Sequence, residues 1–193
     1  ERVTRGLCFD LEVPAPTTAG ERLRTFSLGH LQQLGRGNAA LVRAIDEHLG
    51  GEETATVDLD SSIFEQHGYF REGVRYGYTR VKGFHPLFAF WSERRLLLGC
   101  RLRSGNRASS DGVESFVEEI LQDLVPGRPV RLRMDAGFFA RKVEQLALDY
   151  GLGFSVSAPM NQAIRREIEA LAPTVWKPYP WEAEAEGAEL RYQ

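Results

Sequence analysis

Two aspartates in this sequence directly follow short apolar segments that have the alternation of buried strands. Asp60 ends the segment Ala55-Thr56-Val57-Asp58-Leu59, and Asp135 ends the segment Val130-Arg131-Leu132-Arg133-Met134. A carboxylate at the carboxyl end of a strand lies where α/β proteins build their sites. Asp58 lies two residues before Asp60, so both side chains leave the same face of the strand. If the two strands are neighbours, three carboxylates meet at one edge of a sheet.

Carboxylates grouped in this way suit a hard divalent cation. Oxygen-only ligands favour Mg²⁺ or Mn²⁺, and Mg²⁺ usually takes one or two protein carboxylates while keeping places for water and substrate phosphates. Two such ions about 3.5 to 4 Å apart activate a water and stabilise the leaving oxygen of a phosphoryl displacement. We therefore predict metal ligands among Asp58, Asp60 and Asp135. The simpler alternative is that each aspartate caps a turn or a helix.

The segments around the aspartates have the pattern of a mixed sheet. Three strands are predicted first, the last two joined by the polar turn Ser92-Glu93-Arg94-Arg95, and a helix from Gly112 to Val125 follows them, stopped by Pro126-Gly127. The chain then alternates between strand and helix, which predicts parallel strands with right-handed crossovers. An antiparallel meander, a helix and then parallel strands is the order of a ribonuclease H-like α/β fold. The predicted strands are residues 55–63, 86–91, 96–102, 130–134 and 153–157, and the later helices are residues 140–150 and 161–171.

A helical segment is predicted before this core. Pro14, Pro16 and Gly20 break the chain. Apolar residues then recur at spacings near three and four as far as Leu49, interrupted at Gly35-Arg36-Gly37, so we predict two short helices. With 193 residues, 42% of them hydrophobic, the chain is long enough for one sizeable core. We divide it into an N-terminal helical lead-in, residues 1–52, and a ribonuclease H-like core, residues 53–193.

Composition restricts the class of protein further. Two cysteines and four scattered histidines give neither a disulfide framework nor the ligand spacing of a zinc site. No apolar run approaches the roughly 20 residues that span a bilayer, and no basic-then-apolar leader opens the sequence. We therefore expect a cytoplasmic protein with no membrane partner.

Positive charge is concentrated in one stretch of a chain whose formal net charge is -3. Between Arg71 and Arg107 there are nine basic and two acidic residues, so this stretch has a charge of 9 − 2 = +7. Such a concentration can hold a phosphate backbone. The alternative is a solvated face, because charge runs are usually surface. The DNA-binding candidates are Arg71, Arg75, Arg80, Lys82 and Arg107.

Four groups of residues recur together in one known family. They are Asp60-Ser61-Ser62, then Gly77-Tyr78 with His85-Pro86-Leu87-Phe88-Ala89-Phe90, then Leu102-Arg103-Ser104-Gly105-Asn106, and last Arg133-Met134-Asp135-Ala136-Gly137-Phe138. In this order they resemble the DDE-type insertion-sequence transposases, bacterial cut-and-paste enzymes with a ribonuclease H-like catalytic core. The resemblance covers roughly residues 54–193.

This resemblance implies a function and a site. It implies metal-dependent DNA cleavage and strand transfer at transposon ends, with Asp60 as the first metal ligand, Asp135 as the second and Asp58 as a supporting carboxylate. The implied cofactors are two Mg²⁺ or Mn²⁺ ions. The implied partners are double-stranded DNA with transposon terminal repeats and a second copy of the chain in a transposon-end complex, in the bacterial cytoplasm.

One family feature is missing from the sequence. The third acid of the family is a Glu in a Tyr-x-x-Arg-x-x-x-Glu setting, and no such pattern occurs before Gln193. The resemblance implies that a β-rich insertion begins near Thr174 and that the helix with this Glu lies beyond the end of this chain. We therefore expect a core truncated before its third acid, whose parent protein is the competent enzyme.

Two other functions stay open on the sequence. Val57-Asp58-Leu59-Asp60-Ser61 also resembles the Asp-x-Asp opening of haloacid dehalogenase-like phosphohydrolases, in which Asp58 would be the nucleophile and Asp60 the acid/base. That family uses a doubly wound parallel sheet and a later acidic pair, whereas Asp135 is followed by no second acid. The other alternative is a catalytically inactive DNA-binding fragment, for which salt-dependent duplex binding without cleavage would be the sign.

Overall fold

The computed structural model describes residues 15–51, 54–68, 71–124, 127–180, 182 and 184–190. Of the predicted lead-in, residues 1–14 and 52 therefore lie outside the described residues. The helices are α2 (Pro16–Arg24), α3 (Leu28–Leu49), α4 (Val113–Asp123), α5 (Arg141–Asp149) and α6 (Gln162–Glu169), with short 3-10 helices η1 (Ala136–Phe138) and η2 (Pro173–Val175). The strands are β1 (Ala55–Ser61), β2 (Phe64–Glu65), β3 (Arg75–Tyr76), β4 (Lys82–Phe84), β5 (Leu87–Trp91), β6 (Leu96–Arg101), β7 (Val130–Met134), β8 (Gly153–Val156), β9 (Lys177–Pro178) and β10 (Glu186–Gly187).

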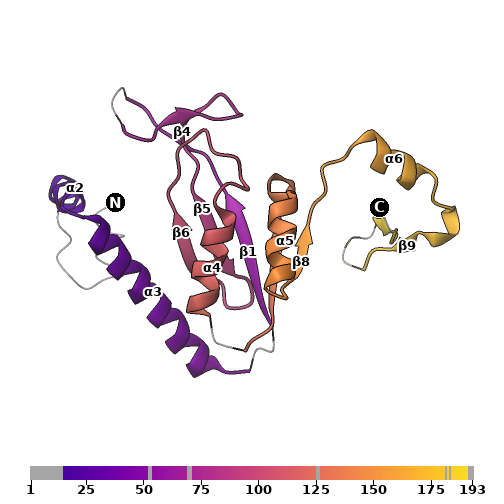
Figure 1. Ribbon diagram of the computed structural model, residues 1–193, viewed down its shortest axis with the longest axis horizontal. Helices are drawn as coiled ribbons and strands as arrows, with labels where there is room; N and C mark the ends of the chain where they lie inside the picture. The colour runs from indigo at the N-terminus through magenta and orange to yellow at the C-terminus, as the bar shows by residue number, and fades with distance from the viewer. Residues whose placement is uncertain are drawn as a thin grey trace.

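A five-stranded mixed sheet forms the centre of the molecule (Figure 1). Its order is β6-β5-β1-β7-β8, with β1, β5 and β6 antiparallel and with β7 and β8 parallel to β1. The chain makes a meander, crosses over through α4 and then crosses again through α5. The predicted ribonuclease H-like α/β fold is confirmed, and β7 has the bounds expected from the sequence.

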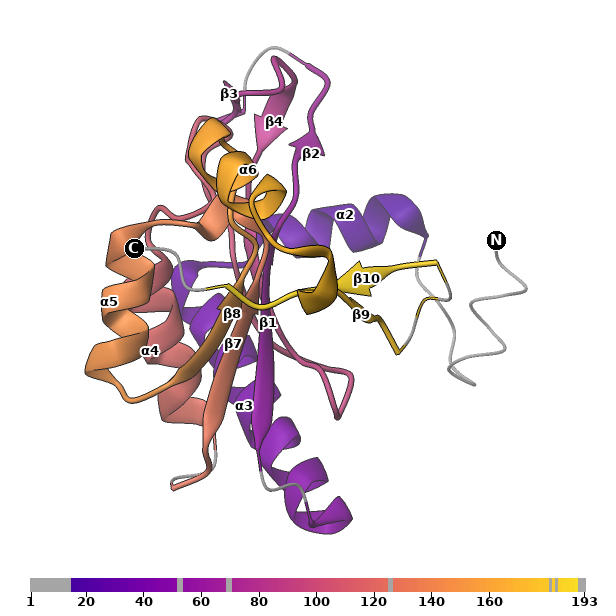
Figure 2. The same cartoon turned by 90° about the vertical axis from the view of Figure 1, so that its right-hand side faces the viewer.

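One face of this sheet is covered by helices, and the residues that alternate toward that face form the core. In β1, Ala55, Val57 and Leu59 are buried, whereas the residues between them are only partly buried. The covering helices α4 and α5 lie together on the same side of the sheet (Figure 2). The period-two pattern of the strands and the apolar stripes of the helices therefore meet in one core, as burial of apolar surface requires. Its largest fully buried side chains include Trp91, Phe138, Leu87, Leu132, Val113 and Val143.

A second, three-stranded sheet with the order β2-β4-β3 lies beyond the carboxyl end of β1 (Figures 1 and 2). It is inserted between β1 and β5 and was not predicted from the sequence. Backbone contacts hold it to the segment after β6. A Cβ at Gly105 would lie 2.2 Å from the Gly83 carbonyl oxygen and 2.4 Å from that of Arg75. Only glycine permits this approach, so Gly105 fixes the small sheet against the main one.

The N-terminal helices differ from the prediction in two respects. The predicted break at Pro14, Pro16 and Gly20 is wrong from residue 16 onward, because α2 begins at Pro16, which the first turn of a helix tolerates, and includes Gly20. The predicted break at Gly35-Arg36-Gly37 is wrong, because α3 runs without interruption. Each helical glycine costs about 1 kcal/mol relative to alanine, and packing of the following turns outweighs that cost. Val42 of α3 joins the core, and Asp46, 3% exposed, forms ion pairs with Arg94 at 3.1 Å and Arg128 at 2.9 Å.

The C-terminal part of the described chain extends away from the main sheet after β8 (Figure 1). It contains α6, η2 and the two-stranded β9–β10 ladder, in which Glu186 pairs with Pro178 and Gly187 with Lys177. Across the described residues, no helix is long and apolar enough to cross a membrane.

Candidate metal centre

Asp60 and Asp135 stand at corresponding positions of two adjacent strands. β1 and β7 pair in parallel, and the last residues in register are Leu59 and Met134. The next residue of each strand is the aspartate, and both aspartates are exposed whereas Leu59 and Met134 are buried. Because side chains alternate between the faces of a strand, the two carboxylates leave the same open face of the sheet. The sequence prediction that these strands are neighbours is therefore confirmed.

Backbone N–H groups orient both carboxylates. The Ser61 N–H donates to Asp60 Oδ1 at 2.7 Å, and the Gly137 N–H donates to Asp135 Oδ1 at 2.9 Å. The second bond caps η1, which the fully buried ring of Phe138 anchors in the core. In each carboxylate, Oδ2 keeps no hydrogen-bond partner among the described residues. Each aspartate can therefore cap its turn through Oδ1 and bind a metal ion through Oδ2, so the capping role that the sequence left open is compatible with a ligand role.

Asp58 has a different environment from the other two aspartates. Its partner in the β1–β7 register is Arg133, whose Nε donates to Oδ1 at 2.6 Å and whose Nη2 donates to Oδ2 at 2.7 Å. This hydrogen bond with Asp58, together with its charge, raises the pKa of the Arg133 guanidinium above its ordinary value. Both oxygens of Asp58 are therefore engaged by a cation, which makes it a neighbour of the site rather than a free ligand.

This pairing also bears on the phosphohydrolase alternative. A nucleophilic Asp58 would need a free carboxylate oxygen, and a doubly wound parallel sheet would have to surround it. Asp58 instead holds a bidentate pair with Arg133, and β1 lies between an antiparallel and a parallel neighbour. The haloacid dehalogenase-like function is not supported.

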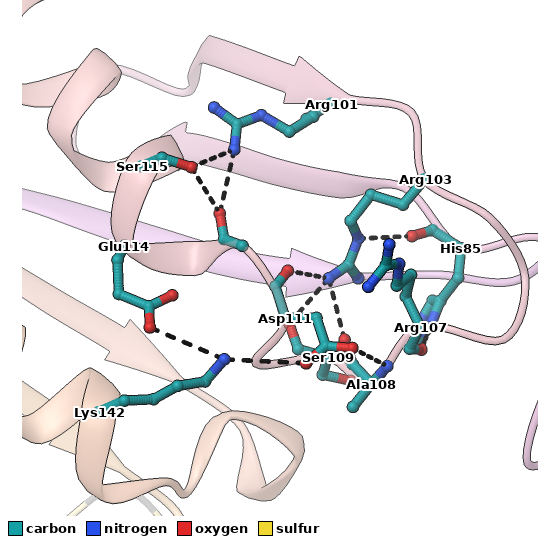
Figure 3. Close-up of polar contacts among 11 residues, drawn as sticks. His85, Arg101, Arg103, Arg107, Ala108, Ser109, Asp111, Glu114, Ser115 and Lys142 are labelled. Atoms are coloured by element: carbon teal, nitrogen blue, oxygen red, sulfur yellow. Dashed lines mark hydrogen bonds and ion pairs between the residues drawn. The ribbon is translucent and has the colours of Figure 1, made fainter.

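The loop between β6 and α4 forms one wall of the site, and a buried arginine organises it (Figure 3). Arg103 is 9% exposed. Its Nε donates to the His85 carbonyl at 2.8 Å, and its Nη1 lies 2.9, 3.2 and 2.6 Å from the carbonyl oxygens of Ala108, Ser109 and Asp111. Burial lowers the pKa of Arg103, and the Asp111 carboxylate opposes that shift. Its Nη2 is buried without a hydrogen-bond partner.

Three side chains from separate segments meet at this wall: Ser109 of the loop itself, Ser61 at the end of β1, and His85 between β4 and β5. Ser61 Oγ and Ser109 Oγ are 2.9 Å apart. His85, 1% exposed, places Nε2 3.1 Å from Ser61 Oγ and Nδ1 2.7 Å from the Arg107 carbonyl oxygen. From the sequence, Ser61, His85 and Arg103 are recognised only as members of the family motifs, and Ser109 is not singled out. No periodic pattern marks them, since each acts through a contact between distant segments.

The predicted DNA-binding residues occupy two places. Arg71, Arg75, Arg80 and Lys82 belong to the small sheet and its connections, and Arg107 belongs to the wall. The guanidinium of Arg80 makes no hydrogen bond or ion pair within the described residues, and neither does that of Arg107. Other basic residues of the +7 stretch are used within the fold, since Arg94 pairs with Asp46 and Arg103 holds the wall.

An open hollow of about 590 Å³ lies beside Asp135. Ser61, Asn106, Arg107 and Tyr78 contribute to its lining, and the Tyr78 side chain is 79% exposed. The hollow therefore joins one predicted metal ligand to one predicted DNA-binding arginine. It is a place where a phosphate can approach the carboxylates from the side of the small sheet.

The donor set fits a hard divalent cation in part. Two carboxylates of adjacent strands, each with one oxygen oriented by the backbone and the other free, provide the oxygen ligands that Mg²⁺ and Mn²⁺ prefer. Within the described residues, no group of three or more His, Cys, Asp or Glu side chains is placed to hold a metal ion. The site is therefore a two-carboxylate site with room for further ligands.

A family model described as "Transposase DDE domain group 1" matches residues 20–193. No curated protein sequence matches this chain significantly. A solved piggyBac transposase synaptic complex with hairpin DNA is similar with a TM-score of 0.43 and 16% identity, over 62% of this chain and 26% of that chain. A Mos1 transposase paired-end complex with left transposon end gives 0.35 and 14%, over 72% and 49%. A Mos1 mariner paired end complex with Mn gives 0.37 and 10%, over 70% and 47%. This chain thus spans about a quarter to a half of the length of those chains, and these scores are too low to support an argument of their own.

Proposed function

This chain belongs to the transposase DDE domain family, group 1, and from that premise we propose that it forms the catalytic core of a transposase that cleaves DNA at transposon ends and transfers the cut strand. The element moved would be a bacterial insertion sequence, and the compartment the bacterial cytoplasm, where chromosomal DNA is accessible. Cleavage and transfer are activities of the complete enzyme, to which this chain would contribute two of the three acids.

A single observation supports this proposal most strongly. The β1–β7 register ends at Leu59 and Met134, so Asp60 and Asp135 leave adjacent strand ends on the same face of the sheet. Two carboxylates fixed by neighbouring strands are held more rigidly than carboxylates on loops, and metal chemistry on phosphates needs such rigidity. The backbone bonds to Oδ1 of each side chain add to that rigidity.

In the proposed site, Asp60 and Asp135 hold Mg²⁺ or Mn²⁺ through their Oδ2 atoms, and Asp58 acts as a supporting carboxylate through Arg133. When bound, two such ions would activate water or a 3′-hydroxyl and stabilise the leaving oxygen of the phosphodiester. A third carboxylate, which the family resemblance implies, would complete the site in the full enzyme. The Asp58–Arg133 ion pair has no net charge and lies on the open face, two residues before Asp60 and Asp135 along their strands.

DNA would approach from the side of the small sheet. Arg107 lines the hollow beside Asp135, and we assign it a contact with the phosphate next to the scissile bond. Arg80 and the other basic residues of the small sheet would hold the flanking duplex by charge, without reading sequence. We further propose that two copies of the complete enzyme act together on a pair of transposon ends.

Titration of the chain with Mn²⁺ tests the metal site, with the electron paramagnetic resonance signal of the free ion as the measure of binding. Asp60→Asn and Asp135→Asn should each weaken Mn²⁺ binding by more than about 100-fold, because each removes a ligand rather than a supporting group. Asp58→Asn is the matched control, since it makes the same chemical change two residues from Asp60. It should weaken Mn²⁺ binding by about 10-fold, less than either ligand variant, because Asp58 supports the site without binding the ion.

Two outcomes would contradict the proposal. If Asp60→Asn and Asp135→Asn bind Mn²⁺ as the unmodified chain does, the two strand ends are not the metal site. If Asp58→Asn abolishes binding instead, the site lies one step down the strand and the ion pair with Arg133 opens in solution. Duplex binding that weakens with salt, in a chain that binds no Mn²⁺, would favour an inactive DNA-binding fragment.

A further inference from the structure

Ser109 touches both of the turns that position the aspartates. Its Oγ lies 2.9 Å from the Oγ of Ser61, the residue directly after Asp60. It also packs on Gly137, two residues after Asp135, because a Cβ at Gly137 would lie 2.8 Å from Ser109 Oγ and 3.0 Å from Ser109 Cβ. One small side chain therefore lies between the turn that follows Asp60 and the turn that follows Asp135.

The positive φ that often explains a glycine does not explain Gly137, which is not among the residues with positive φ in the described chain. Contact with Ser109 does explain it, since any larger residue would have to displace either the serine or the turn. The Gly137 N–H donates to Asp135 Oδ1. A shift of Gly137 would therefore move the orientation of the carboxylate with it.

A buried histidine closes the arrangement on the other side. His85 Nδ1 faces a carbonyl oxygen, that of Arg107, at 2.7 Å, so Nδ1 bears a hydrogen. Its Nε2 faces Ser61 Oγ at 3.1 Å. A hydroxyl both donates and accepts, so Ser61 can join the imidazole ring and Ser109 at the same time. Because the ring is 1% exposed, water has little access to replace these bonds.

The loop that presents Ser109 is held in place by Arg103. The guanidinium lies within hydrogen-bond distance of the carbonyl oxygens of Ala108, Ser109 and Asp111, and its Nε bonds the His85 carbonyl (Figure 3). The two partners of Ser61, Ser109 and His85, are thus both attached to one buried side chain. Such convergence leaves Ser109 little freedom to follow a displaced turn.

We propose that Ser61, His85 and Ser109 form a clasp that fixes the separation and orientation of the Asp60 and Asp135 carboxylates, with Ser109 as its central positioning residue. The inference rests on the proposed function, because the carboxylates are taken as metal ligands. None of the three clasp residues is itself a proposed metal ligand. It acts on the residue that follows Asp60 and on the turn that orients Asp135.

The test compares Ser109→Ala with Ser110→Ala. Ser110 is the adjacent serine, and its hydroxyl makes no hydrogen bond within the described residues, so it controls for loss of a hydroxyl in the same loop. Ser109→Ala should weaken Mn²⁺ binding by about 10-fold, the lower end of the effect of removing a group that orients a metal ligand. Ser110→Ala should leave the affinity unchanged, and both variants should unfold within a few degrees of the unmodified chain.

Non-additivity gives a second readout that a purely structural serine would not produce. Ser61→Ala should also weaken Mn²⁺ binding by about 10-fold, and Ser61→Ala/Ser109→Ala should again lose about 10-fold rather than about 100-fold, because both changes break the same contact. An additive loss in the double variant would overturn the clasp, and so would wild-type Mn²⁺ affinity in Ser109→Ala.

Amide hydrogen exchange, measured on the metal-free chain, tests the clasp without relying on metal binding. The N–H groups of Ser61 and Gly137 both donate to aspartate Oδ1 atoms, so Ser109→Ala should remove part of their protection while Ser110→Ala should not. Unchanged exchange at both amides would overturn the clasp. If the unmodified chain binds no Mn²⁺, the proposed function fails, and exchange at these two amides still decides whether the clasp exists.

Discussion

Replacement of Arg103 by methionine is the most informative test of how the wall of the site is held. Methionine keeps much of the length and volume of the side chain but removes every donor. Arg103 Nη1 carries two hydrogens for its three carbonyl neighbours, so one hydrogen is shared, and with Nε the residue makes about three full hydrogen bonds. Three bonds from a charged donor at about 1.5 kcal/mol each, less about 1.5 kcal/mol for the buried unpartnered Nη2, leave about 3 kcal/mol.

This magnitude sets a clear expectation for urea and thermal unfolding. Arg103→Met should lower the free energy of unfolding by about 3 kcal/mol, which corresponds to a fall in Tm of about 6 to 12 °C for a chain of this size. Arg103→Lys should recover only part of the lost stability, because one ammonium group cannot reach all the acceptors that lie around the planar guanidinium. Arg101→Met is the comparison, because Arg101 has a side chain that is 27% exposed, an ion pair with the mostly exposed Glu119, and exposed hydrogen bonds to the Gly112 carbonyl and Ser115 Oγ. It should cost about 1 to 2 kcal/mol, less than Arg103→Met.

An opposite outcome has a physical basis and would refute the reasoning. A buried charge can be replaced by an apolar side chain with a gain in stability, because the cost of desolvating the charge disappears. That gain requires that no hydrogen-bonding group is left without a partner. Here the backbone carbonyl oxygens of the loop would lose their donor when Arg103 is replaced. If Arg103→Met is as stable as Arg101→Met, water or a rearranged loop satisfies those carbonyls, and Arg103 does not hold the wall.

Four further substitutions test the small sheet, the helix α3 and the electrostatics. Gly105→Ala should destabilise the chain by about 1 to 3 kcal/mol in urea unfolding, because its Cβ would meet two backbone carbonyl oxygens at under 2.5 Å. Gly35→Ala in α3 has open space around it and should stabilise the chain by about 0.5 to 1 kcal/mol. Equal effects of the two substitutions would contradict the contact at Gly105. Burial is the largest single influence on the pKa of Glu93 and raises it, but the hydrogen bonds to the carboxylate, first among them those from Thr56, together outweigh burial and hold the pKa below its ordinary value of 4.5. Its contribution to stability is therefore present above pH 4.5 and lost as the pH falls below it, so the stability difference between Glu93→Gln and the unmodified chain should shrink in acid; a constant difference would count against it. Arg80→Ala should weaken duplex DNA binding for all sequences and reduce the slope of log affinity against log salt by about 1, measured by fluorescence anisotropy, and an unchanged slope would remove Arg80 from the interface.

The main sheet could be predicted because its signal is local and periodic. Val57 and Leu59 alternate with polar residues in β1, as Leu132 and Met134 do in β7, and this alternation corresponds to one covered and one open face. The small sheet could not be predicted in this way. Its strands have two or three residues, too few to show a period. Its stability depends on contacts such as that of Gly105 with β4, which join segments far apart in the sequence.

The environment of Asp58 could have been anticipated from spacing alone. Asp58 precedes Asp60 by two residues, and Arg133 precedes Asp135 by two. Once the two strand ends are placed side by side, the same offset puts Asp58 and Arg133 opposite each other on the same face, which the β1–β7 register bears out. The faces of β1 alone do not reveal this pairing, because the cation lies on the neighbouring strand β7.

Net charge was a poor guide to the site because it does not distinguish buried cations from exposed ones. The stretch from Arg71 to Arg107 has a charge of +7, yet Arg94 and Arg103 use their charge on a buried carboxylate and on loop carbonyls. The cations left on the surface are concentrated on the small sheet and at Arg107, beyond the strand ends that carry Asp60 and Asp135. A polyanion attracted to those cations would meet the carboxylates only at that edge of the sheet. Fixed cations there would offset the repulsion between phosphates and the two aspartates, and that repulsion would be strongest before any metal binds. Charge-reversal of Arg80 should therefore weaken DNA binding more in the absence of divalent metal than in its presence, and an equal loss under both conditions would show that the two charge clusters act independently.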